Sequence, residues 1–529
     1  MLTFALYLLL IISSFKKILF WTNLWQTKEY RLDRLWIHFK ETYQGRSLLF
    51  SNVTIAGILL FASYMLVILY DFLTPFFQLF VVSFFLFYIC DFAKQIIDKK
   101  AKRPKLTFKS GVIVMLSLLF VTLLFFFPLT DKYLWMLIIL GIISLNVSIW
   151  VFIFSFPSEI YTDLIAQKAR NKMKKLKNIK VIAVSGSYGK SSTKEAIFSI
   201  LSQKYNVVKT PLSNNTTIGI SKTILKKVNE NTDLFVVEMG AYKIGEIAQL
   251  CMIVRPDISI TTAISDQHIS LYGSFSNVIQ SEKELIDSLS KKGLALFNGN
   301  CEEAKILFEK TKQKKLLYKV LSKYVNSNSN SITATNLTFS KNGCEFTVIF
   351  KNNKYKFQSD LLGEHVVENL LPGIFLGLHF NLSENEIQKG IKKLKPLPHT
   401  MEKVILKNGA IAIDDTFNAS PESVISASKF MKYFNKKTYF VLTPLIELGK
   451  NAHARHVEVG KSLKNVDYVF VTNKNYFNDI KRGIGEKSKA KLIYGSYEEI
   501  ANMIEKFSEK GDCIIFEGKE SYVVLKHLL

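Results

Sequence analysis

The stretch that decides the fold is VIAVSGSYGKSSTKEAIFSIL, which runs from Val181 to Leu201. It contains most of a short β-branched run, Ile179–Val184, of the kind that forms a buried parallel strand. A loop with two glycines follows, and a helix-like segment begins at Thr193. Strand, glycine loop, Lys-Ser and helix in this order predict a phosphate-binding loop.

The residues of this loop are the types that the phosphates of ATP require. Glycine lets backbone N–H groups approach phosphate oxygens, and the N-terminus of the next helix adds the positive end of its dipole. We expect Lys190 to neutralise the β- and γ-phosphates and Ser191 to hold Mg²⁺. Val184 stands where the standard motif has its first glycine, so a glycine-rich turn without a ligand is the alternative. The predicted ATP-binding residues here are Gly186, Ser187, Tyr188, Gly189, Lys190, Ser191 and Ser192.

Two more predicted strands supply polar residues at their ends. Asp233–Glu238 reads as a strand that ends in an acid, and another strand ends near His268. Because the carboxyl ends of strands face the ligand in an open α/β sheet, Glu238 is a candidate Mg²⁺ ligand and His268 a candidate site residue. A lone histidine is more often structural or solvated, and that alternative stays open. The helix that follows carries Lys283.

The first third of the chain has a different character, because it contains long apolar runs. Each run approaches the roughly 20 residues that a helix needs to cross a bilayer, which predicts about five transmembrane helices rather than buried helices of a soluble core. The first run lacks a basic n-region and a convincing cleavage site, so we expect an uncleaved anchor rather than a signal peptide. The runs are Leu2–Phe20, Val53–Tyr70, Phe76–Phe92, Gly111–Leu129 and Tyr133–Phe154.

The charges of the connecting loops predict an orientation. Lysine and arginine gather in Phe15–Arg46 and between Lys94 and Lys109, whereas the connections near Asp71 and Asp131 contain only Lys132. Basic loops stay in the cytoplasm. We therefore expect a multi-pass protein of the cell (inner) membrane, with its N-terminus outside and everything from about Ser158 in the cytoplasm.

One basic segment, Trp25–Glu41, mixes aromatic and basic residues. It fits an amphipathic helix in the membrane interface, or equally a positive-inside anchor with no further role.

The overall composition indicates which classes of partner the protein is expected to bind. The net charge is +25, but the lysines and arginines are dispersed and no aromatic-basic RNA motif occurs, so membrane lipid is expected and nucleic acid is not. The five cysteines are odd in number and include no C-x-x-C pair, which argues against a disulfide framework or a zinc site. A reducing compartment fits the soluble part.

The motifs together resemble the Mur ligase family, the ATP-dependent muramyl-peptide ligases of cell-wall synthesis, and within it the branch that adds D-alanyl-D-alanine. The resemblance covers about Lys180 to the C-terminus, with several separated motifs in the right order. The matching residues are Gly186–Ser192, Glu238–Ala241, Gly245–Ile247, Pro256–Asp257, His268, Gly273–Ser274, Lys283–Glu284, Gly363–Asn369, Asp414–Pro421 and Glu447–Gly449 with His456.

This resemblance implies a reaction and a set of roles. A carboxylate is phosphorylated by ATP to an acyl phosphate, which an amine then attacks to give an amide, ADP and phosphate. The implied catalytic residues are Lys190, His268 and Lys283, with Lys283 carbamylated to help hold a second Mg²⁺. The implied metal ligands are Ser191, Glu238, His268 and Lys283, and the implied nucleotide contacts outside the loop are Asn369, Asp415 and Asn418.

Purely structural roles remain possible for residues in two of these motifs. Lys283 could be an ordinary lysine paired with Glu282 or Glu284 on a solvated helix. Asp414 and Asp415 could serve a turn or a helix cap at the end of a strand.

The chain also departs from the family pattern. Membrane segments stand in place of the uridine-nucleotide-binding domain. His399–Glu402 replaces a Gly-Arg-x-Glu motif, so Lys395 or Lys403 would have to substitute for the arginine that approaches the γ-phosphate. Thr443-Pro444 replaces Gly-Asp, and Glu517-Gly518-Lys519 replaces Lys-Gly-Ser.

The expected fold class is an α-helical membrane domain, then an α/β P-loop central domain and a Rossmann-like α/β C-terminal domain. We expect them at residues 1–157, 158–396 and 397–529, with a hinge at the two prolines of Leu394–His399. Val325–Asn336 predicts a surface loop, and Leu337–Asp360 predicts a β-meander.

The leading hypothesis is a membrane-anchored ligase that adds an amino acid or dipeptide, D-Ala-D-Ala first, to a wall-precursor peptide. That peptide is nucleotide-linked or lipid-linked. A ligase resembling poly-γ-glutamate synthase, or one that amidates a lipid-linked substrate, is the alternative among enzymes. A non-catalytic nucleotide-binding scaffold with a relic ligase fold is the alternative from another class.

Overall fold

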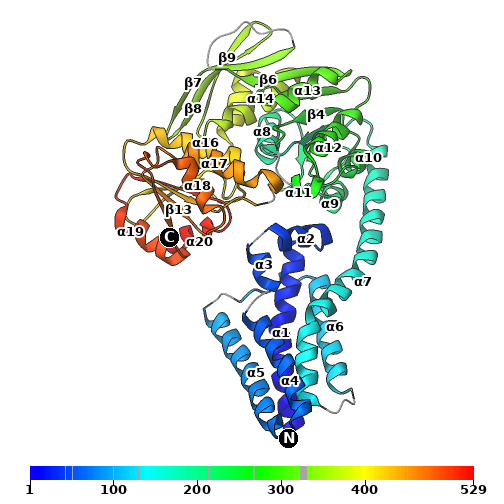
Figure 1. Cartoon of the computed structure of the whole chain (residues 1–529). Helices are drawn as coiled ribbons and strands as arrows, with labels where there is room; N and C mark the ends of the chain where they lie inside the picture. The colour runs from blue at the N-terminus through cyan, green and yellow to red at the C-terminus, as the bar shows by residue number, and fades with distance from the viewer. Residues whose placement is uncertain are drawn as a thin grey trace. The chain divides into compact units, whose positions relative to one another are not determined.

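The computed structural model describes residues 1–41, 43–49, 52–98, 101–127, 131–212, 214–265, 269–321, 330–446 and 448–529. The chain divides into two compact units, Met1–Asp163 and Leu164–Leu529 (Figure 1). The first is helical, and the second contains two β-sheets.

The described part of the first unit is built from helices alone. Its elements are α1 (Leu2–Thr27), α2 (Leu32–Glu41), α3 (Tyr43–Leu49), α4 (Asn52–Leu69), η1 (Asp71–Leu73), α5 (Thr74–Ile97), α6 (Phe108–Phe125) and the first part of α7 (Lys132–Lys175). Leu10, Val81, Ile113 and Ile143 are completely buried where α1, α5, α6 and α7 pack together.

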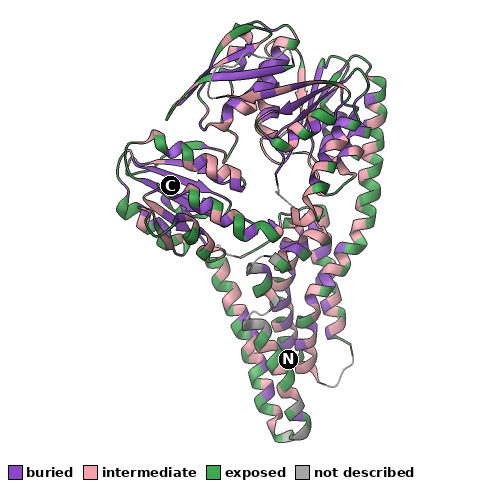
Figure 2. Cartoon of the chain, turned by 45° about the horizontal axis from the view of Figure 1, so that its top comes forward, coloured by how far each residue is buried: buried purple, intermediate pink, exposed green. Residues whose placement is uncertain are grey.

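Four of these helices, α1, α5, α6 and α7, are long and apolar enough to cross a membrane. The remaining predicted run lies in α4, where the apolar stretch Ile55–Ile68 is shorter. Large apolar side chains such as Phe80, Phe87 and Leu123 remain exposed on the helices, which are mostly pink and green in Figure 2. Because a soluble protein rarely exposes so much apolar surface, these faces indicate contact with lipid.

The predicted interfacial segment, Trp25–Glu41, is divided between two helices. α1 continues through Thr27, and α2 begins at Leu32. Trp25 is buried within the bundle and donates its Nε1–H to Ser148 Oγ at 3.1 Å, so only the second half of the segment forms a separate short helix.

The larger sheet of the second unit has nine strands in the order β2-β3-β1-β4-β5-β6-β7-β8-β9. The strands from β2 to β7 in this order are parallel, and β8 and β9 extend the sheet in antiparallel fashion. Their bounds are β1 (Lys180–Ser185), β2 (Val207–Lys209), β3 (Leu234–Glu238), β4 (Ile258–Thr261), β5 (Leu294–Asn298), β6 (Lys314–Val320), β7 (Ser331–Ser340), β8 (Gly343–Phe350) and β9 (Asn353–Ser359).

Helices cover both faces of this sheet. The alternate residues Ile182 and Val184 of β1 pack with α8, α14 and α15, whereas Val181 and Ala183 pack with α9 and α10. The end of α7 joins the second group through Ala169. The helices are α8 (Lys190–Leu201), α9 (Thr217–Lys227), α10 (Glu246–Val254), α11 (Ile269–Tyr272), α12 (Phe275–Asp287), α13 (Glu302–Lys310), α14 (His365–His379) and α15 (Glu384–Lys392).

The predicted β-meander is confirmed as β7, β8 and β9. Two-residue turns join the strands, and Lys351 and Asn352 of the second turn both have positive φ, as such hairpins require. The predicted surface loop is wrong for its second half, because β7 already begins at Ser331. Ile332 and Ala334 alternate inward, so burial outweighs the turn-forming composition. Residues 322–329 lie outside the described part of the chain.

The second sheet has six strands in the order β10-β11-β15-β12-β13-β14, and only β10 is antiparallel to its neighbour. Buried residues line both faces, and the strands are largely purple in Figure 2. The strands are β10 (Glu402–Ile405), β11 (Ile411–Asp415), β12 (Thr438–Leu442), β13 (Tyr468–Val471), β14 (Lys491–Tyr494) and β15 (Cys513–Glu517). The helices are α16 (Pro421–Phe430), η2 (Met431–Tyr433), η3 (Gly449–Asn451), α17 (Ala452–Ser462), α18 (Phe477–Ile484), α19 (Tyr497–Phe507) and α20 (Ser521–Leu528).

The order of the larger sheet determines where a ligand can bind. The chain leaves β1 toward the β2 edge of the sheet and leaves β4 toward the β5 edge. Ligands of open α/β sheets bind at such a switch point, outside the carboxyl ends of the two strands. The ends of β1 and β4 are therefore the place to look for a site.

Candidate active site at the phosphate loop

The loop between β1 and α8 requires glycine at two positions. Gly186 has φ +134° and Gly189 has φ +83°, values that other residues rarely adopt. A Cβ on Gly186 would also lie 2.0 Å from Thr262 Oγ1. The backbone can therefore turn sharply from the strand into the N-terminus of α8, as a phosphate cradle requires.

The end of β4 holds the loop in place. Thr262 Oγ1 donates hydrogen bonds to the carbonyls of Ser185 (3.0 Å) and Tyr188 (2.7 Å). The Ser187 N–H donates to Ala263 O at 2.7 Å, and the Ser265 N–H donates to Ser187 Oγ at 2.9 Å. The loop is thus fixed at the predicted switch point.

Lys190 and Ser191 begin α8, directly after the glycine loop. Lys190 Nζ donates to Gly186 O (2.5 Å) and Ser187 O (2.9 Å), so the ammonium lies against the loop itself. Ser191 Oγ donates to Glu238 Oε2 at 2.8 Å. The structure therefore brings together three of the residues that the sequence predicts for this site, namely Lys190, Ser191 and Glu238.

Glu238 belongs to a buried polar network that the sequence analysis missed. Lys194 Nζ lies 3.1 Å from Glu238 Oε2 and also donates to Leu212 O, and Asn215 Nδ2 donates to Glu238 Oε1 at 3.1 Å. Lys194 and Glu238 are almost completely buried. Ser191 and Lys194 are three residues apart on α8, and this spacing was the available signal that both face the same acid.

The structure places Lys283 and its neighbour Glu282 in different surroundings on α12. Lys283 Nζ forms an ion pair with Asp287 Oδ2 at 2.5 Å, and both side chains are exposed. Glu282 is 5% exposed and borders Ser185, Gly186 and Lys190. Burial raises the pKa of the Glu282 carboxyl, and Ser185 and the Lys190 ammonium oppose that shift. The structure thus brings Glu282, and not Lys283, to the phosphate loop.

The structure describes His456 of the matching motifs but does not describe His268. His268 lies outside the described residues, and so does Glu447. Ile269 follows His268 and lies close to Gly449, because a Cβ on Gly449 would be 3.3 Å from Ile269 Cγ2.

His456 is buried and structural. Its Nε2 accepts from Leu445 N at 3.0 Å, and its Nδ1 donates to Ala452 O at 2.6 Å. Its ring also stacks on Tyr476, with the ring centroids 4.1 Å apart. Burial lowers the pKa of His456 to about 4, so the imidazole is neutral at physiological pH.

A mainly apolar cavity adjoins the loop beside Asn369. Asn369 Oδ1 accepts from Thr193 Oγ1 at 3.5 Å and lies 2.7 Å from the position of a Cβ on Gly189. A planar, largely apolar group with a few polar edges fits such a lining. The lining residues include Ser192, Ala196, Leu361, Val366, Asn369, Leu370, Leu394, Lys395, Leu397 and Met401.

Lys395 and Lys403, the two substitutes considered for the missing arginine, have different positions. Lys395 lines this cavity, together with Ser192 of the loop. Lys403 donates to Asn342 Oδ1 at 3.5 Å. Lys395 is therefore the lysine that the structure brings to the nucleotide side of the site.

The aspartates at the end of β11 are both buried. Asp414 Oδ2 lies 2.8 Å from His399 Nδ1, and Asp414 Oδ1 accepts from Thr416 Oγ1 at 2.6 Å. Asp415 accepts from the Met401 N–H at 3.2 Å and is the register partner of Glu517 on β15.

Asp415 and Glu517 form a coupled acid pair. Burial raises the pKa values of both Asp415 and Glu517. The charge of Asp415 raises the pKa of Glu517 further, whereas the hydrogen bond with Glu517 lowers the pKa of Asp415 and so opposes the effect of burial. The predicted contact Asn418 is exposed in the loop before α16.

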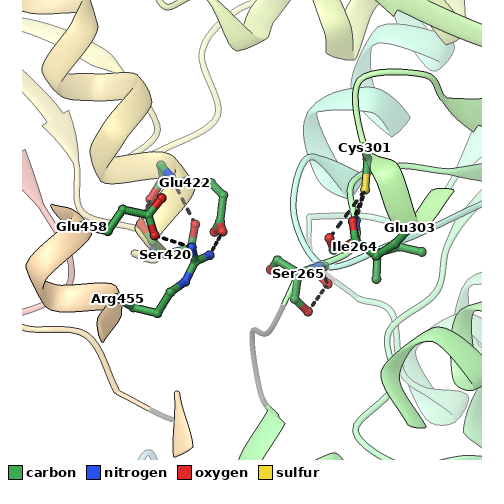
Figure 3. A network of polar contacts seen from close by, with 10 residues as sticks. Ile264, Ser265, Cys301, Glu303, Ser420, Glu422, Arg455 and Glu458 are labelled. Carbon is green, nitrogen blue, oxygen red and sulfur yellow. Dashed lines mark hydrogen bonds and ion pairs between the residues drawn. The ribbon is translucent and has the colours of Figure 1, made fainter. Parts of the chain in front are cut away.

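Figure 3 shows two separate polar clusters, one around Arg455 and one around Cys301. In one, Arg455 of α17 binds Glu422 of α16 and also Glu458, the latter at 2.5 Å. In the other, Cys301 accepts from the Ile264 N–H at 3.3 Å and donates to Glu303.

The loop residue Tyr188 is affected by groups from both clusters. Burial raises the pKa of Tyr188, and charges add to that effect: Glu368, Glu422 of the first cluster, and Cys301 and Glu303 of the second. Glu422 belongs to α16, so the charge that acts on Tyr188 comes from the first turn of that helix.

The residues around Ser191 fit a Mg²⁺ ion. Ser191 Oγ and Glu238 Oε2 are adjacent oxygens, and Glu282 Oε2 is a buried oxygen that accepts no hydrogen bond within the described chain. Hard oxygen ligands are those that Mg²⁺ prefers. No three His, Cys, Asp or Glu side chains cluster closely enough to hold a metal unaided in the part of the chain that is described. Hydroxyl and phosphate oxygens would therefore complete the coordination.

The fold and the loop define a P-loop protein with two α/β sheets, and comparison with known families identifies it further. Residues 184–377 match the Mur ligase middle domain, and residues 401–520 match the domain described as Mur ligase, glutamate ligase domain. The chain belongs to the Mur ligase family, whose members are ATP-dependent acid–amino-acid ligases. A helical region with four long apolar helices replaces the family's N-terminal domain.

Individual relatives agree with this assignment. The UDP-N-acetylmuramoyl-tripeptide--D-alanyl-D-alanine ligase of Buchnera aphidicola is 28% identical over 365 residues, which cover 67% of this chain and 77% of the relative. The enzyme of that name from Bacillus subtilis is 28% identical over 345 residues, covering 64% and 73%. The crystal structure of MurF from Acinetobacter baumannii has a TM-score of 0.62 at 21% identity, covering 69% of this chain and 80% of that one. MurF from Thermotoga maritima, in complex with ADP, gives 0.61 at 22% identity, covering 69% and 83%.

Proposed function

We propose that this chain is a membrane-anchored amide ligase that joins an amino acid or dipeptide, D-Ala-D-Ala first, to a wall-precursor peptide. The observation that carries the proposal is the phosphate loop at the switch point, with Ser191 hydrogen-bonded to the buried acid Glu238. The incoming group is inferred from the curated relatives, which are D-alanyl-D-alanine ligases.

The reaction starts from a carboxylate, a poor acyl donor because its leaving group would be oxide. Transfer of the γ-phosphoryl group from ATP to the carboxylate gives an acyl phosphate, and attack by the amine then releases phosphate. Phosphoryl transfer depends mainly on positioning and charge neutralisation. Lys190 would leave the Gly186 and Ser187 carbonyls to balance the charge of the phosphates.

The other predicted residues would either bind Mg²⁺ and adenine or close the site over the acyl phosphate. Ser191 and Glu238 would hold Mg²⁺, which when bound neutralises phosphate charge. The apolar cavity would take the adenine, with Asn369 at its polar edge and Lys395 at its wall. Asp415 and Asn418 belong to the sheet and loop before α16, whose Glu422 acts on the loop tyrosine, so closure there would exclude water from the acyl phosphate.

Two predicted ligands keep the status of predictions. His268 is expected at the end of the segment after β4 as a cation ligand. Lys283 would have to leave its ion pair with Asp287 before it could act as a carbamylated ligand.

The location of the reaction is also part of the proposal. The helices indicate multi-pass membrane anchoring, and the basic loops favour a cytoplasmic active site, where ATP is available. An anchor of this kind brings the ligase close to a precursor peptide attached to lipid. A ligase that makes γ-glutamyl chains or amidates a lipid-linked substrate would use the same nucleotide chemistry.

A non-catalytic scaffold is the alternative that specific residues favour. The arginine expected before β10 is missing, and Glu517 forms a buried acid pair with Asp415 where the family has a lysine. Such a protein would bind nucleotide without forming an amide.

The test is ADP release by the full chain in detergent, measured with candidate precursor peptides and amines. We expect release only when acceptor and amine are both present, with a product of the mass of the amide. Lys190→Ala should abolish turnover while membrane insertion is unchanged, and Lys305→Ala, an exposed lysine on α13, is the matched control. ATP binding without release under any combination would support the scaffold instead.

A further inference from the structure

Glu282 is a buried acid whose carboxyl borders the phosphate loop. Its side chain is 5% exposed, and its Oε2 accepts no hydrogen bond from any residue that the structure describes. Burying a carboxylate oxygen without a donor is costly, so native proteins rarely leave one unless it binds an ion or a water. Glu282 is therefore unlike the neighbouring Glu284, which accepts from the N–H groups of Gly245 and Ala248.

Packing of α12 fixes the direction of this acid. Val278 and Leu285 are buried on the face that turns toward the sheet, and Leu285 packs with Val181 and Ala183 of β1. Glu282 lies between them at helical spacing, so its side chain points to the end of the same strand. Lys283 is one position further around the helix and faces solvent.

Two carboxylates thus flank the end of β1. Glu238 on β3 is the register partner of Val184, and Glu282 borders Ser185 and Gly186, the next two residues. Ser191 adds a hydroxyl to Glu238 at 2.8 Å. Lys190 is close to Glu282, but its ammonium is hydrogen-bonded to two loop carbonyls.

We propose that Glu282 is a direct ligand of a divalent cation at the phosphate loop, and that this encoded carboxylate supplies the anionic oxygen that a carbamylated lysine would otherwise provide. The inference rests on the proposed function, because the cation would serve the phosphates of ATP. It assigns the role that the sequence predicted for Lys283 to the residue before it. No carbon dioxide is then needed to complete the site.

The experiment measures cation binding directly. Mn²⁺ is titrated into the full chain in detergent with ADP present, and free Mn²⁺ is followed by electron paramagnetic resonance. We expect Glu282→Gln to weaken Mn²⁺ binding at least tenfold, while ADP binding in EDTA is unchanged. Glu302→Gln, an exposed glutamate on α13, is the matched control and should bind Mn²⁺ like the unaltered chain.

Two further variants distinguish the role of Glu282 from that of Lys283. Glu282→Asp keeps the charge and should bind Mn²⁺ with an affinity between those of the unaltered chain and Glu282→Gln. This variant guards against misfolding of Glu282→Gln, as does circular dichroism of each protein. Lys283→Ala should bind Mn²⁺ normally, and added bicarbonate should change no affinity.

Wild-type Mn²⁺ affinity in Glu282→Gln would overturn the proposal. Loss of Mn²⁺ binding in Lys283→Ala, or binding that needs bicarbonate, would overturn it in favour of the carbamylated lysine. The titration does not depend on turnover, so a chain that forms no amide but loses Mn²⁺ in Glu282→Gln would refute the proposed function and still support the cation ligand.

Discussion

At the scale of single residues, Lys194 shows how a buried charge in the site is compensated. Its ammonium is completely buried and lies 3.1 Å from Glu238 Oε2. A lysine is rarely buried unless it is paired, and each partner of such a pair depends on the other. The pair therefore restricts how far Glu238 could move if it bound a cation, as the proposed function requires.

We predict that Lys194→Met destabilises the protein by about 3–5 kcal/mol, because it leaves the Glu238 carboxylate buried without its counter-charge. Denaturant unfolding of the full chain in detergent gives the free energy. The double variant Lys194→Met/Glu238→Gln should recover part of the loss, since no uncompensated charge remains. Equal stability of the single variant and the unaltered chain would show that the two groups do not interact energetically.

The acid pair Asp415 and Glu517 predicts a pH dependence of stability. Burial raises both pKa values above those of the unfolded chain, which are about 4. The folded state therefore binds more protons, and the stability associated with the pair is complete below about pH 4 and falls as the pH rises through the folded pKa values.

Glu517→Gln removes this titration. The amide can still accept from Ser423, which donates to Glu517 Oε1 at 2.6 Å, and it can donate to Asp415. We expect a gain of about 1–3 kcal/mol at pH 8, the cost of one unsatisfied buried group, and a smaller gain at pH 5. Thermal unfolding at the two pH values measures it, with exposed Glu505→Gln as control. A gain that is larger at pH 5 would contradict the assignment.

At the scale of elements, the loop between β1 and α8 combines two separate demands on Gly186. Its φ of +134° excludes most side chains, and a Cβ would also collide with Thr262 Oγ1. Gly485 at the end of α18 has φ +79° but no atom within 4 Å of its Cβ position, so it shares the conformational demand without the collision.

We predict that Gly186→Ala weakens ADP binding at least tenfold, because the loop must shift away from Thr262 to admit the methyl group. Gly485→Ala should lower stability by about 1–3 kcal/mol, the cost of a backbone conformation that only glycine adopts readily, and leave ADP binding unchanged. Isothermal titration calorimetry and unfolding measure the two quantities. Normal ADP affinity in Gly186→Ala would show that this turn does not shape the site.

The sequence predicts these elements to different degrees. The strand, glycine loop and helix were readable because each has its own local signal, and so were the hairpins of the meander. The first residues of β7 were not, since a strand at that position depends on pairing with β6 and not on composition. The placement of Glu282 was readable in part, because Val278, Glu282 and Leu285 share one face of α12. Only the fold shows that this face meets the phosphate loop.

At the scale of the whole molecule, the long apolar helices and the ligase sheets come from different sequence patterns. Both were predictable, since apolar length and P-loop motifs act locally. The links between distant residues, such as Lys194 with Glu238 or Asp415 with Glu517, were not, because pairs of this kind are created by the order of strands in a sheet.

Orientation can be tested with single cysteines. We predict that Asp131→Cys reacts with an impermeant maleimide in intact cells, whereas Lys105→Cys reacts only after permeabilisation, because basic loops remain in the cytoplasm. The unaltered chain measures the background from Cys90, which is exposed on α5. The opposite pattern would place the ligase sheets outside the cell and contradict the proposed use of ATP.

The helix α7 contains an apolar stretch that is long enough to span a membrane, and its last turns pack Ala169 and Met173 into the core of the second unit. Under the proposed function, a catalytic unit joined in this way would not exchange with the cytosol as a peripheral enzyme does. Its meetings with a lipid-borne acceptor would then be collisions between two molecules diffusing in one plane. The reaction rate would be governed by the number of acceptors per unit area of bilayer, and diluting the cytosol would leave that rate unchanged.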